Sequence, residues 1–413
     1  MINNLHRRNN AMARICLLSI LLAVTLAAIW LTGCSRKQGA ESPGQGDRAV
    51  VRLDDCRVTI DASGWLRFKG LAQQLGTAEK PSREDLIAFA ETPALTIWRQ
   101  SLRPNEPLPQ RIADWMAYAF DPQERERPKR KPVFEQRSFD RLYNYCFAQR
   151  EAISDYIARY MSDGGPCRAL EIAREWIDPE HLAADLTLVF LPAKPEIRLL
   201  DDHLIVDVGV AYAGGADQLN RQIASLLYRD RQGIKGDNPL RCRGAAAIAQ
   251  SLRVLVNEGT AAWISRVGDT YFGHDHPSLF GNLVPPEEYY EDALETVATW
   301  NRLLAVLLGD PEQLQSHGHD FSRYMGGSGA FLGMGYCMAN AIVGRLGEER
   351  LRQVSRSVPD FIAAYQEAAS ANPQPYPVPG AAGHELYESL PPLAPEVFEK
   401  LHALLLQEFA EAE

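Results

Sequence analysis

Two pairs of histidines are the residues of this chain whose types and spacing best suit a metal ion. His274 and His276 form the first pair, and His317 and His319 form the second. Pairs of this kind can bind zinc or copper, and each has an aspartate beside it. Because glycine, aspartate, serine and proline surround both, we expect solvated histidines in two loops. The alternative is a metal site, which requires both loops to meet near the carboxylate of Glu258.

Glu258 stands in the most distinctive stretch of the chain, Asn257–Ile264 (NEGTAAWI). A predicted strand, the pair Gly214-Gly215, a predicted helix and a loop precede it. This order resembles the gluzincin branch of zinc metallopeptidases. It is most similar to a family assigned as zinc-dependent peptidases, whose second helix carries a Glu-Gly-x-Ala motif. Stretches at 335–347 and 359–365 also fit that family's C-terminal helices.

The resemblance implies a zinc ion held by a His-Glu-x-x-His motif on the first helix and by Glu258 on the second. This chain has Asn220–Leu226 (NRQIASL) at the position of the first motif. In one register, Arg221 and Ser225 replace the two histidines, and Gln222 replaces the glutamate. The pattern that normally supplies two zinc ligands and the base is therefore lost.

A second register of the same helix, shifted by one residue, also lacks the histidines and the glutamate. It places Gln222, Ile223 and Leu226 at the three positions. Arg221 stays protonated and has no lone pair for a cation, and a glutamine cannot take the proton from a zinc-bound water. We therefore predict no catalytic residue, no cofactor and no metal. Zinc enters only under the alternative in which Glu258 and the histidine pairs bind it.

A vestigial site of this kind still has to accommodate the carboxylate of Glu258. A buried carboxylate needs a partner, and Arg221 on the facing helix is the bidentate partner we expect. The alternative is that Glu258 faces solvent. Tyr336 matches a tyrosine of the family and is either a neighbour of the site or a core residue.

The elements that position these residues indicate an α+β fold that is mostly helical, with a small β-sheet packed on zincin-like helices. Strands are predicted near residue 50, at Leu186–Leu191 and Ile197–Leu200, and at Leu204–Ala211. Ser82 is predicted to cap a helix, and Gly244–Ile264 is predicted to be strongly apolar and helical. The expected domains are a signal peptide (1–33), a lipidated linker (34–49), a mainly helical region (50–165) and a zincin-like region (166–413).

Cys34 ends the first hydrophobic run of the chain and predicts where the protein resides. Arginines precede an apolar core from Ile15 to Trp30, which is the pattern of a secretory signal peptide. The ending Leu31-Thr-Gly-Cys34 resembles a bacterial lipobox. That resemblance implies cleavage before Cys34, its acylation with chains such as palmitate, and anchoring outside the cytoplasm. Because Ser35 is not aspartate, the resemblance implies the outer membrane, periplasmic side, in a Gram-negative source. An uncut transmembrane anchor is the alternative.

The net charge limits the classes of partner, and the number of cysteines limits the disulfides. The formal net charge is −10, and removal of residues 1–33, which hold three arginines and no acid, makes it −13. An acidic body is not suited to nucleic acid. The mature chain has five cysteines besides Cys34, an odd number, so one or two disulfides are possible and at least one thiol stays outside them.

These observations lead to three functional hypotheses. The first is a lipid-anchored pseudoenzyme with a degenerate peptidase-like fold that binds a peptide, a protein or a cell-envelope component. The second is an active metallohydrolase with atypical ligands. The third is a structural envelope lipoprotein. In each, the lipid anchor makes the membrane a partner.

Overall fold

The computed structural model describes residues 50–53, 56–75, 81–101, 108–120, 144–182, 185–193, 197–231, 239–266, 286–327, 330–371 and 390–410. All of them belong to one compact unit, Asp47–Glu413, separate from Met1–Gly46. The predicted signal peptide, Cys34, His274 and His276 lie outside the described residues. None of the described helices has the length and apolar character needed to cross a membrane.

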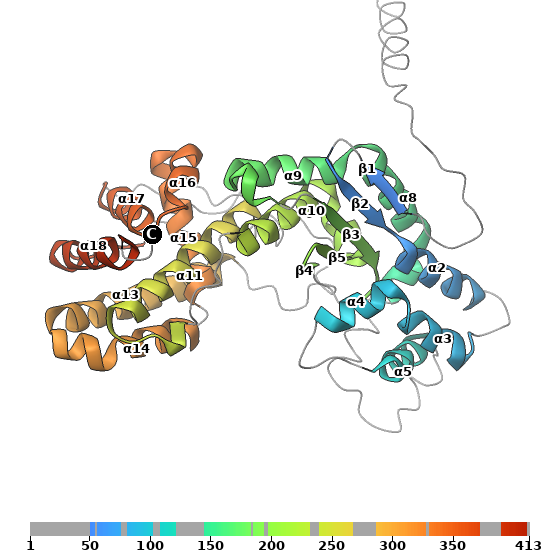
Figure 1. Ribbon diagram of the computed structural model, residues 1–413, viewed down its shortest axis with the longest axis horizontal. Helices are drawn as coiled ribbons and strands as arrows, with labels where there is room; N and C mark the ends of the chain where they lie inside the picture. Colours follow the sequence, from blue (N-terminus) through green and yellow to red (C-terminus); the bar gives the residue numbers. More distant parts are fainter. Residues whose placement is uncertain are drawn as a thin grey trace, which may run out of the picture. The chain divides into compact units, whose positions relative to one another are not determined.

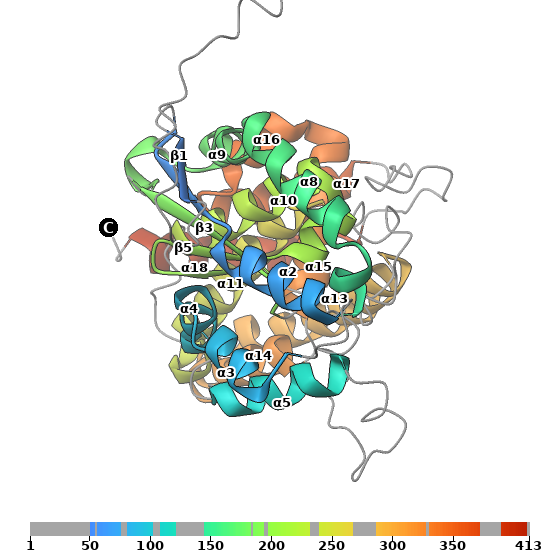
Figure 2. The same ribbon diagram turned by 90° about the vertical axis from the view of Figure 1, so that its right-hand side faces the viewer.

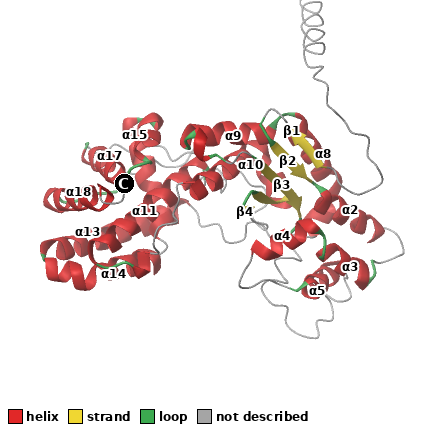
Figure 3. Ribbon diagram, in the orientation of Figure 1, coloured by secondary structure: helices red, strands yellow, loops and turns green. Residues whose placement is uncertain are grey.

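The fold is α+β and mostly helical, as the sequence predicts (Figure 1; Figure 3). The strands are β1 (Val50–Leu53), β2 (Val58–Asp61), β3 (Leu186–Leu191), β4 (Ile197–Leu200) and β5 (His203–Asp207). The helices before β3 are α2 (Ser63–Leu75), α3 (Arg83–Ala90), α4 (Pro93–Ser101), α5 (Pro109–Phe120), α8 (Arg150–Ser162) and α9 (Gly165–Trp176). Those after β5 are α10 (Val208–Arg231), α11 (Gly244–Ile264), α13 (Pro286–Gly309), α14 (Pro311–Gly327), α15 (Ala330–Leu346), α16 (Glu348–Val354), α17 (Val358–Ser370) and α18 (Pro395–Ala410).

The five described strands form one mixed sheet in the order β1-β2-β3-β5-β4. The central strands β2, β3 and β5 are parallel, and the edge strands β1 and β4 are antiparallel to their neighbours. In Figure 2 the labels β1, β3 and β5 follow this order. The parallel strand β3 is buried along most of its length, as parallel strands covered on both faces are. The edge strand β4 is half-buried.

The predicted strand at Leu204–Ala211 is wrong in its second half, because β5 ends at Asp207 and α10 begins at Val208. The buried carboxylate of Asp207 accounts for this change. Its Oδ1 accepts a hydrogen bond from the backbone N–H of Val210 at 2.9 Å, and its Oδ2 accepts one from Ala193 at 3.0 Å. An aspartate that satisfies a first-turn N–H starts a helix. Gly215, at φ 77°, then kinks α10, so the glycine pair lies within the helix.

Other predicted elements are confirmed with shifted ends. Ser82 caps α3 through a capping box with Asp85, and α11 has the predicted bounds. The predicted loop around His317 and His319 is wrong, because both lie in α14. Their neighbour Gly318 is needed there, since a Cβ on it would lie 2.4 Å from the carbonyl oxygen of Gly244 in α11.

Helices α11 and α15 cross with their backbones in contact. A Cβ on Gly259 would lie 2.2 Å from the carbonyl carbon of Gly335, and a Cβ on Gly335 would lie 2.4 Å from the carbonyl oxygen of Leu255. Only glycine allows backbones to approach this closely. Gly259, the residue after Glu258, therefore sets the position along α11 at which α15 crosses it.

Candidate functional site

A row of polar contacts joins α10 to α11 where the family resemblance would place a metal. The amide Nε2 of Gln218 donates to the carbonyl oxygen of Ser265 at 2.9 Å. The buried hydroxyl of Ser225 donates to the carbonyl oxygen of Ala261 at 2.8 Å. Residue numbers rise along α10 as they fall along α11, so the two helices run antiparallel through this row.

Glu258 closes the row through an ion pair with Arg229. A guanidinium nitrogen of Arg229 lies 3.1 Å from Oε2 of Glu258, and their side chains are 33% and 30% exposed. The expected pair between Arg221 and Glu258 is therefore wrong. Arg221 lies two turns earlier on α10, and its Nε donates to Asp217 Oδ2 at 3.1 Å. The Glu258 side chain is 30% exposed and paired, so it lies between the buried and the solvated carboxylate expected from sequence.

Hydrogen bonds of two buried tyrosines tie α10 to two other parts of the fold, α8 and the end of α16. The hydroxyl of Tyr160 in α8 donates to Asn220 Oδ1 at 2.7 Å. The hydroxyl of Tyr228 donates to the carbonyl oxygen of Ser355, after α16, at 3.2 Å. These bonds restrict the rotation of α10 about its axis, which decides which of its side chains face α11.

The remaining residues of the predicted vestigial site are half-buried or belong to the core. Gln222 is half-buried on α10. Tyr336 is 3% exposed and belongs to the hydrophobic core, in agreement with the core alternative. Its neighbour Cys337 is also buried, and burial raises the pKa of this thiol to about 12. A thiol with so high a pKa is protonated at neutral pH and is not a nucleophile.

A cleft opens between the edge strand β4 and α10. Its volume is about 370 Å³. Ile197, Leu199 and Leu200 line it from β4, and Leu226 and Arg229 line it from α10. Arg198 and Asp230 also line it, so the cleft combines aliphatic side chains with charged ones, among them the guanidinium that binds Glu258. This residue set was not predicted from the sequence, because the signal lies in the pairing of β4 at the sheet edge.

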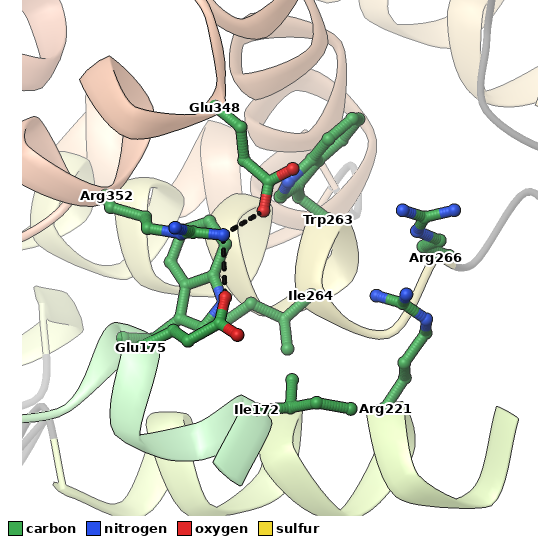
Figure 4. A pocket seen from close by; sticks show the side chains of 9 residues that line it. Ile172, Glu175, Arg221, Trp263, Ile264, Arg266, Glu348 and Arg352 are labelled. Atoms are coloured by element: carbon green, nitrogen blue, oxygen red, sulfur yellow. Dashed lines mark hydrogen bonds and ion pairs between the residues drawn. The ribbon is translucent and has the colours of Figure 1, made fainter. Parts of the chain in front are cut away.

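A second cavity, of about 200 Å³, lies where α9, α10, α11 and α16 meet (Figure 4). Arg221 lines it from α10, and Trp263 and Arg266 line it from the end of α11. Arg221 is thus brought to a site other than that of Glu258.

The described histidine pair, His317 and His319, has its ion-pair contacts with Asp320 and not with Glu258. Nδ1 of His317 lies 3.1 Å from Asp320 Oδ2, and Nε2 of His319 lies 3.4 Å from Asp320 Oδ1. Across the part of the chain that the structure describes, no group of three or more His, Cys, Asp or Glu side chains could hold a metal ion. The solvated state of His274 and His276 stays a prediction.

The α10–α11 face does not fit the zinc ion that the family resemblance implies. The Ser225 hydroxyl is directed to a backbone carbonyl, and the Glu258 carboxylate is bound by a guanidinium. A catalytic zinc needs three protein ligands with free lone pairs. Zinc is bound in proteins by carboxylate, imidazole or thiolate groups, and Glu258 is the one such group in this row, where it already has a cationic partner.

Comparison with known proteins supports the resemblance over part of the chain. Residues 244–374 match the model of the family described as "Putative zinc dependent peptidase (DUF5700)". The match covers α11 through α17 and leaves out α10, although the sequence resemblance was expected from about residue 180. No curated protein and no solved structure matches the chain in the corresponding searches.

Proposed function

We propose that this protein is a non-catalytic, lipid-anchored relative of zinc peptidases that binds an extended peptide segment in the cleft between β4 and α10. The similarity to a family of zinc-dependent peptidases supports the ancestry. The ion pair between Arg229 and Glu258 is the main observation that supports the proposed loss of catalysis. The guanidinium of Arg229 supplies a positive charge beside the Glu258 carboxylate, at the position that a metal ion would take.

The geometry favours a different register for the lost motif from either of those considered from sequence. Ser225 and Arg229 are four residues apart, and both face α11 beside Glu258. Two ligands at i and i+4 on one helix face are what a His-Glu-x-x-His motif provides. In this register Leu226 stands where the glutamate base would be. A leucine cannot accept a proton, so water activation is lost along with metal binding.

The cleft retains what an extended peptide needs. β4 is an edge strand of the sheet, paired only with β5 among the described strands. Edge strands can bind a further strand through backbone hydrogen bonds, while pockets beside them take alternate side chains. The apolar side chains of Leu199 and Leu226 supply such a pocket, and Arg229 adds a positive charge at its wall.

An extracytoplasmic location is part of the proposal. Cys56 and Cys167 form a disulfide, as expected for a protein of an oxidising compartment. The lipobox-like ending at Cys34 supplies the anchor. The unmodified protein should incorporate labelled palmitate in expressing cells, and Cys34→Ala should abolish this incorporation. Absence of label in the unmodified protein, or equal labelling of the variant, would contradict the anchor.

A gain-of-function experiment tests the register and the ancestry together. The triple variant Ser225→His, Leu226→Glu, Arg229→His restores the motif opposite Glu258. We expect it to bind about one zinc per chain after gel filtration, measured by elemental mass spectrometry. The matched control is Arg221→His, Gln222→Glu, Ser225→His, which restores the motif in the sequence-derived register. We expect that variant to carry no stoichiometric zinc.

The unmodified protein, measured beside these variants, separates the competing functions. We expect it to lack stoichiometric zinc and to bind a fluorescein-labelled apolar decapeptide, with weaker binding when Leu199→Asp is introduced. Zinc in the unmodified protein that is lost in His317→Ala would favour the metallohydrolase. Absence of peptide binding would favour a structural envelope role. Either result contradicts the proposal.

A further inference from the structure

The cavity between α9, α10, α11 and α16 has charged residues on two sides and apolar residues between them (Figure 4). Ile172 of α9 and Ile264 of α11 contribute aliphatic side chains, and Trp263 contributes an indole. Arg221 lies eight residues before Arg229 on α10, so this cavity is distinct from the β4 cleft.

On one side of the cavity, the carboxylates are already bound by an arginine. Arg352 lies 2.6 Å from Glu175 and 2.7 Å from Glu348, and its guanidinium stacks 5.5 Å from the ring centre of Trp176. Glu349 adds a further contact at 3.5 Å. This cluster ties α9 to α16, and both glutamates that line the cavity belong to it.

The other side of the cavity presents two guanidinium groups. Figure 4 shows those of Arg221 and Arg266 next to each other, away from the Arg352 cluster. Arg221 contacts Asp217 through Nε, and the Asp217 side chain is 76% exposed, so solvent screens that pair. An anion placed between two neighbouring guanidinium groups is attracted to both of them.

The backbone conformation of Arg266 is one that an arginine rarely adopts. Arg266 follows the C-cap residue Ser265 of α11 and has a φ of 45°, in the left-handed region. Helices commonly end with such a residue, and it is usually glycine because a Cβ is disfavoured there. An arginine in this conformation is an observed outlier from which a functional role can be inferred.

We propose that this cavity binds a phosphate group, held between the guanidinium groups of Arg221 and Arg266. Guanidinium groups bind phosphate oxygens through paired hydrogen bonds, and a tetrahedral dianion can accept from two arginines that approach from different helices. The volume of about 200 Å³ suits a phosphate monoester with a small organic group. Ile172, Ile264 and Trp263 would contact that group. The proposal is independent of the function proposed for the β4 cleft.

Calorimetric titration of the full-length chain with inorganic phosphate and with phenyl phosphate tests the site. We expect saturable binding of both, with tighter binding of phenyl phosphate because its ring contacts the apolar wall. Arg221→Gln should weaken binding about tenfold or more, the cost of one charge-assisted contact. Arg323→Gln is the matched control, since Arg323 is 70% exposed on α14. It should leave the affinity unchanged.

Arg266→Gly separates a binding role from a structural one. Glycine suits the left-handed backbone, so we expect a melting temperature equal to or above that of the unmodified protein, together with loss of phosphate binding. A lowered melting temperature with unchanged affinity would show that Arg266 is structural and would overturn the proposal. Absence of saturable binding in the unmodified protein, or equal affinities in Arg221→Gln and Arg323→Gln, would overturn it as well.

Discussion

Arg229 and Arg221 have the same side chain on the same helix, yet the structure gives them different partners. Arg229 lies 3.1 Å from Glu258, and Arg221 lies 3.1 Å from Asp217. Eight residues separate the two arginines, which is a little over two turns of helix. The ionic environment of Glu258 is therefore set by the position of α11 along α10 and not by residue type.

A double-mutant cycle between Arg229 and Glu258 measures this ion pair. Both side chains are about one-third exposed, so the pair falls between an exposed one and a fully buried one. We expect Arg229→Ala and Glu258→Ala to couple by about 1 kcal/mol in the free energy of unfolding. Urea denaturation of the two single variants and the double variant provides the measurement.

Arg221 supplies the control for that cycle. Arg221→Ala and Glu258→Ala should be additive within about 0.5 kcal/mol, because the two side chains share no partner. Strong coupling between Arg221 and Glu258, with none between Arg229 and Glu258, would contradict the observed pairing.

The importance of Glu258 could be predicted from sequence, but its partner could not. The stretch Asn257–Ile264 is distinctive in residue type, so it identifies the second helix without any structure. The facing residue depends on the rotation and offset of α10, which are held by the bonds from Tyr160 of α8 to Asn220 and from Tyr228 of α10 to Ser355. Neither contact has a local sequence signal. The choice between Arg221 and Arg229 was therefore beyond reach from the chain alone.

At the scale of helices and strands, local patterns predicted most of the elements. The capping box at Ser82 and the apolar run of α11 are local signals, and both are confirmed. The failures have tertiary causes. Asp207 ends β5 because its carboxylate bonds two backbone N–H groups, one of them distant in sequence. His317 and His319 lie in helix α14, and Gly318 between them lies against the backbone of Gly244 in α11.

Gly259→Ala tests whether the crossing of α11 and α15 requires backbone contact. An added Cβ would lie 2.2 Å from the carbonyl carbon of Gly335, so one helix must move. We expect a loss of about 2–3 kcal/mol in the free energy of unfolding, measured by urea denaturation.

Gly70→Ala is the matched control in the interior of α2. A Cβ there meets no atom within 4 Å, so only helix propensity changes. We expect a gain of about 0.5–1 kcal/mol. Similar effects of the two substitutions would mean that Gly259 matters through propensity alone and not through the crossing.

At the scale of the whole molecule, one disulfide links the sheet to a helix far along the chain. Cys56, between β1 and β2, is bonded to Cys167 in α9, at a sequence separation of 111 residues. Cys146, Cys242 and Cys337 are outside any disulfide in the described chain. The outcome agrees with the expected number of disulfides, although the pairing itself could not be read from sequence.

Removal of this disulfide should weaken the fold without abolishing it. A cross-link over a long loop lowers the entropy of the unfolded chain, so Cys56→Ala, Cys167→Ala should lose about 2–4 kcal/mol of unfolding free energy. Thermal denaturation with and without reducing agent checks this. Reductant should lower the melting temperature of the unmodified protein and leave that of the double variant unchanged. A fall in the melting temperature of the double variant would show that the reductant acts elsewhere.

Buried thiols and phenols should make the protein sensitive to alkali. Burial raises the pKa of Cys337 from 9.0 to about 12 and that of Tyr228 from 10.0 to about 12. Below pH 9 these groups are protonated in both the folded and the unfolded chain, so their full contribution to stability is present. Above that pH the unfolded chain releases its protons first, and stability falls until the folded pKa is reached.

Cys337→Ala isolates one part of this dependence. Between about pH 9 and 12 the unmodified protein should lose about 1.4 kcal/mol more per pH unit than the variant, since each group contributes that slope. Urea denaturation at several pH values provides both curves. Val343→Ala, on the same helix, removes packing without removing a titrating group, so its slope should equal that of the unmodified protein. Equal slopes for Cys337→Ala and Val343→Ala would mean that the Cys337 thiol ionises alike in both states and is not protected by the fold.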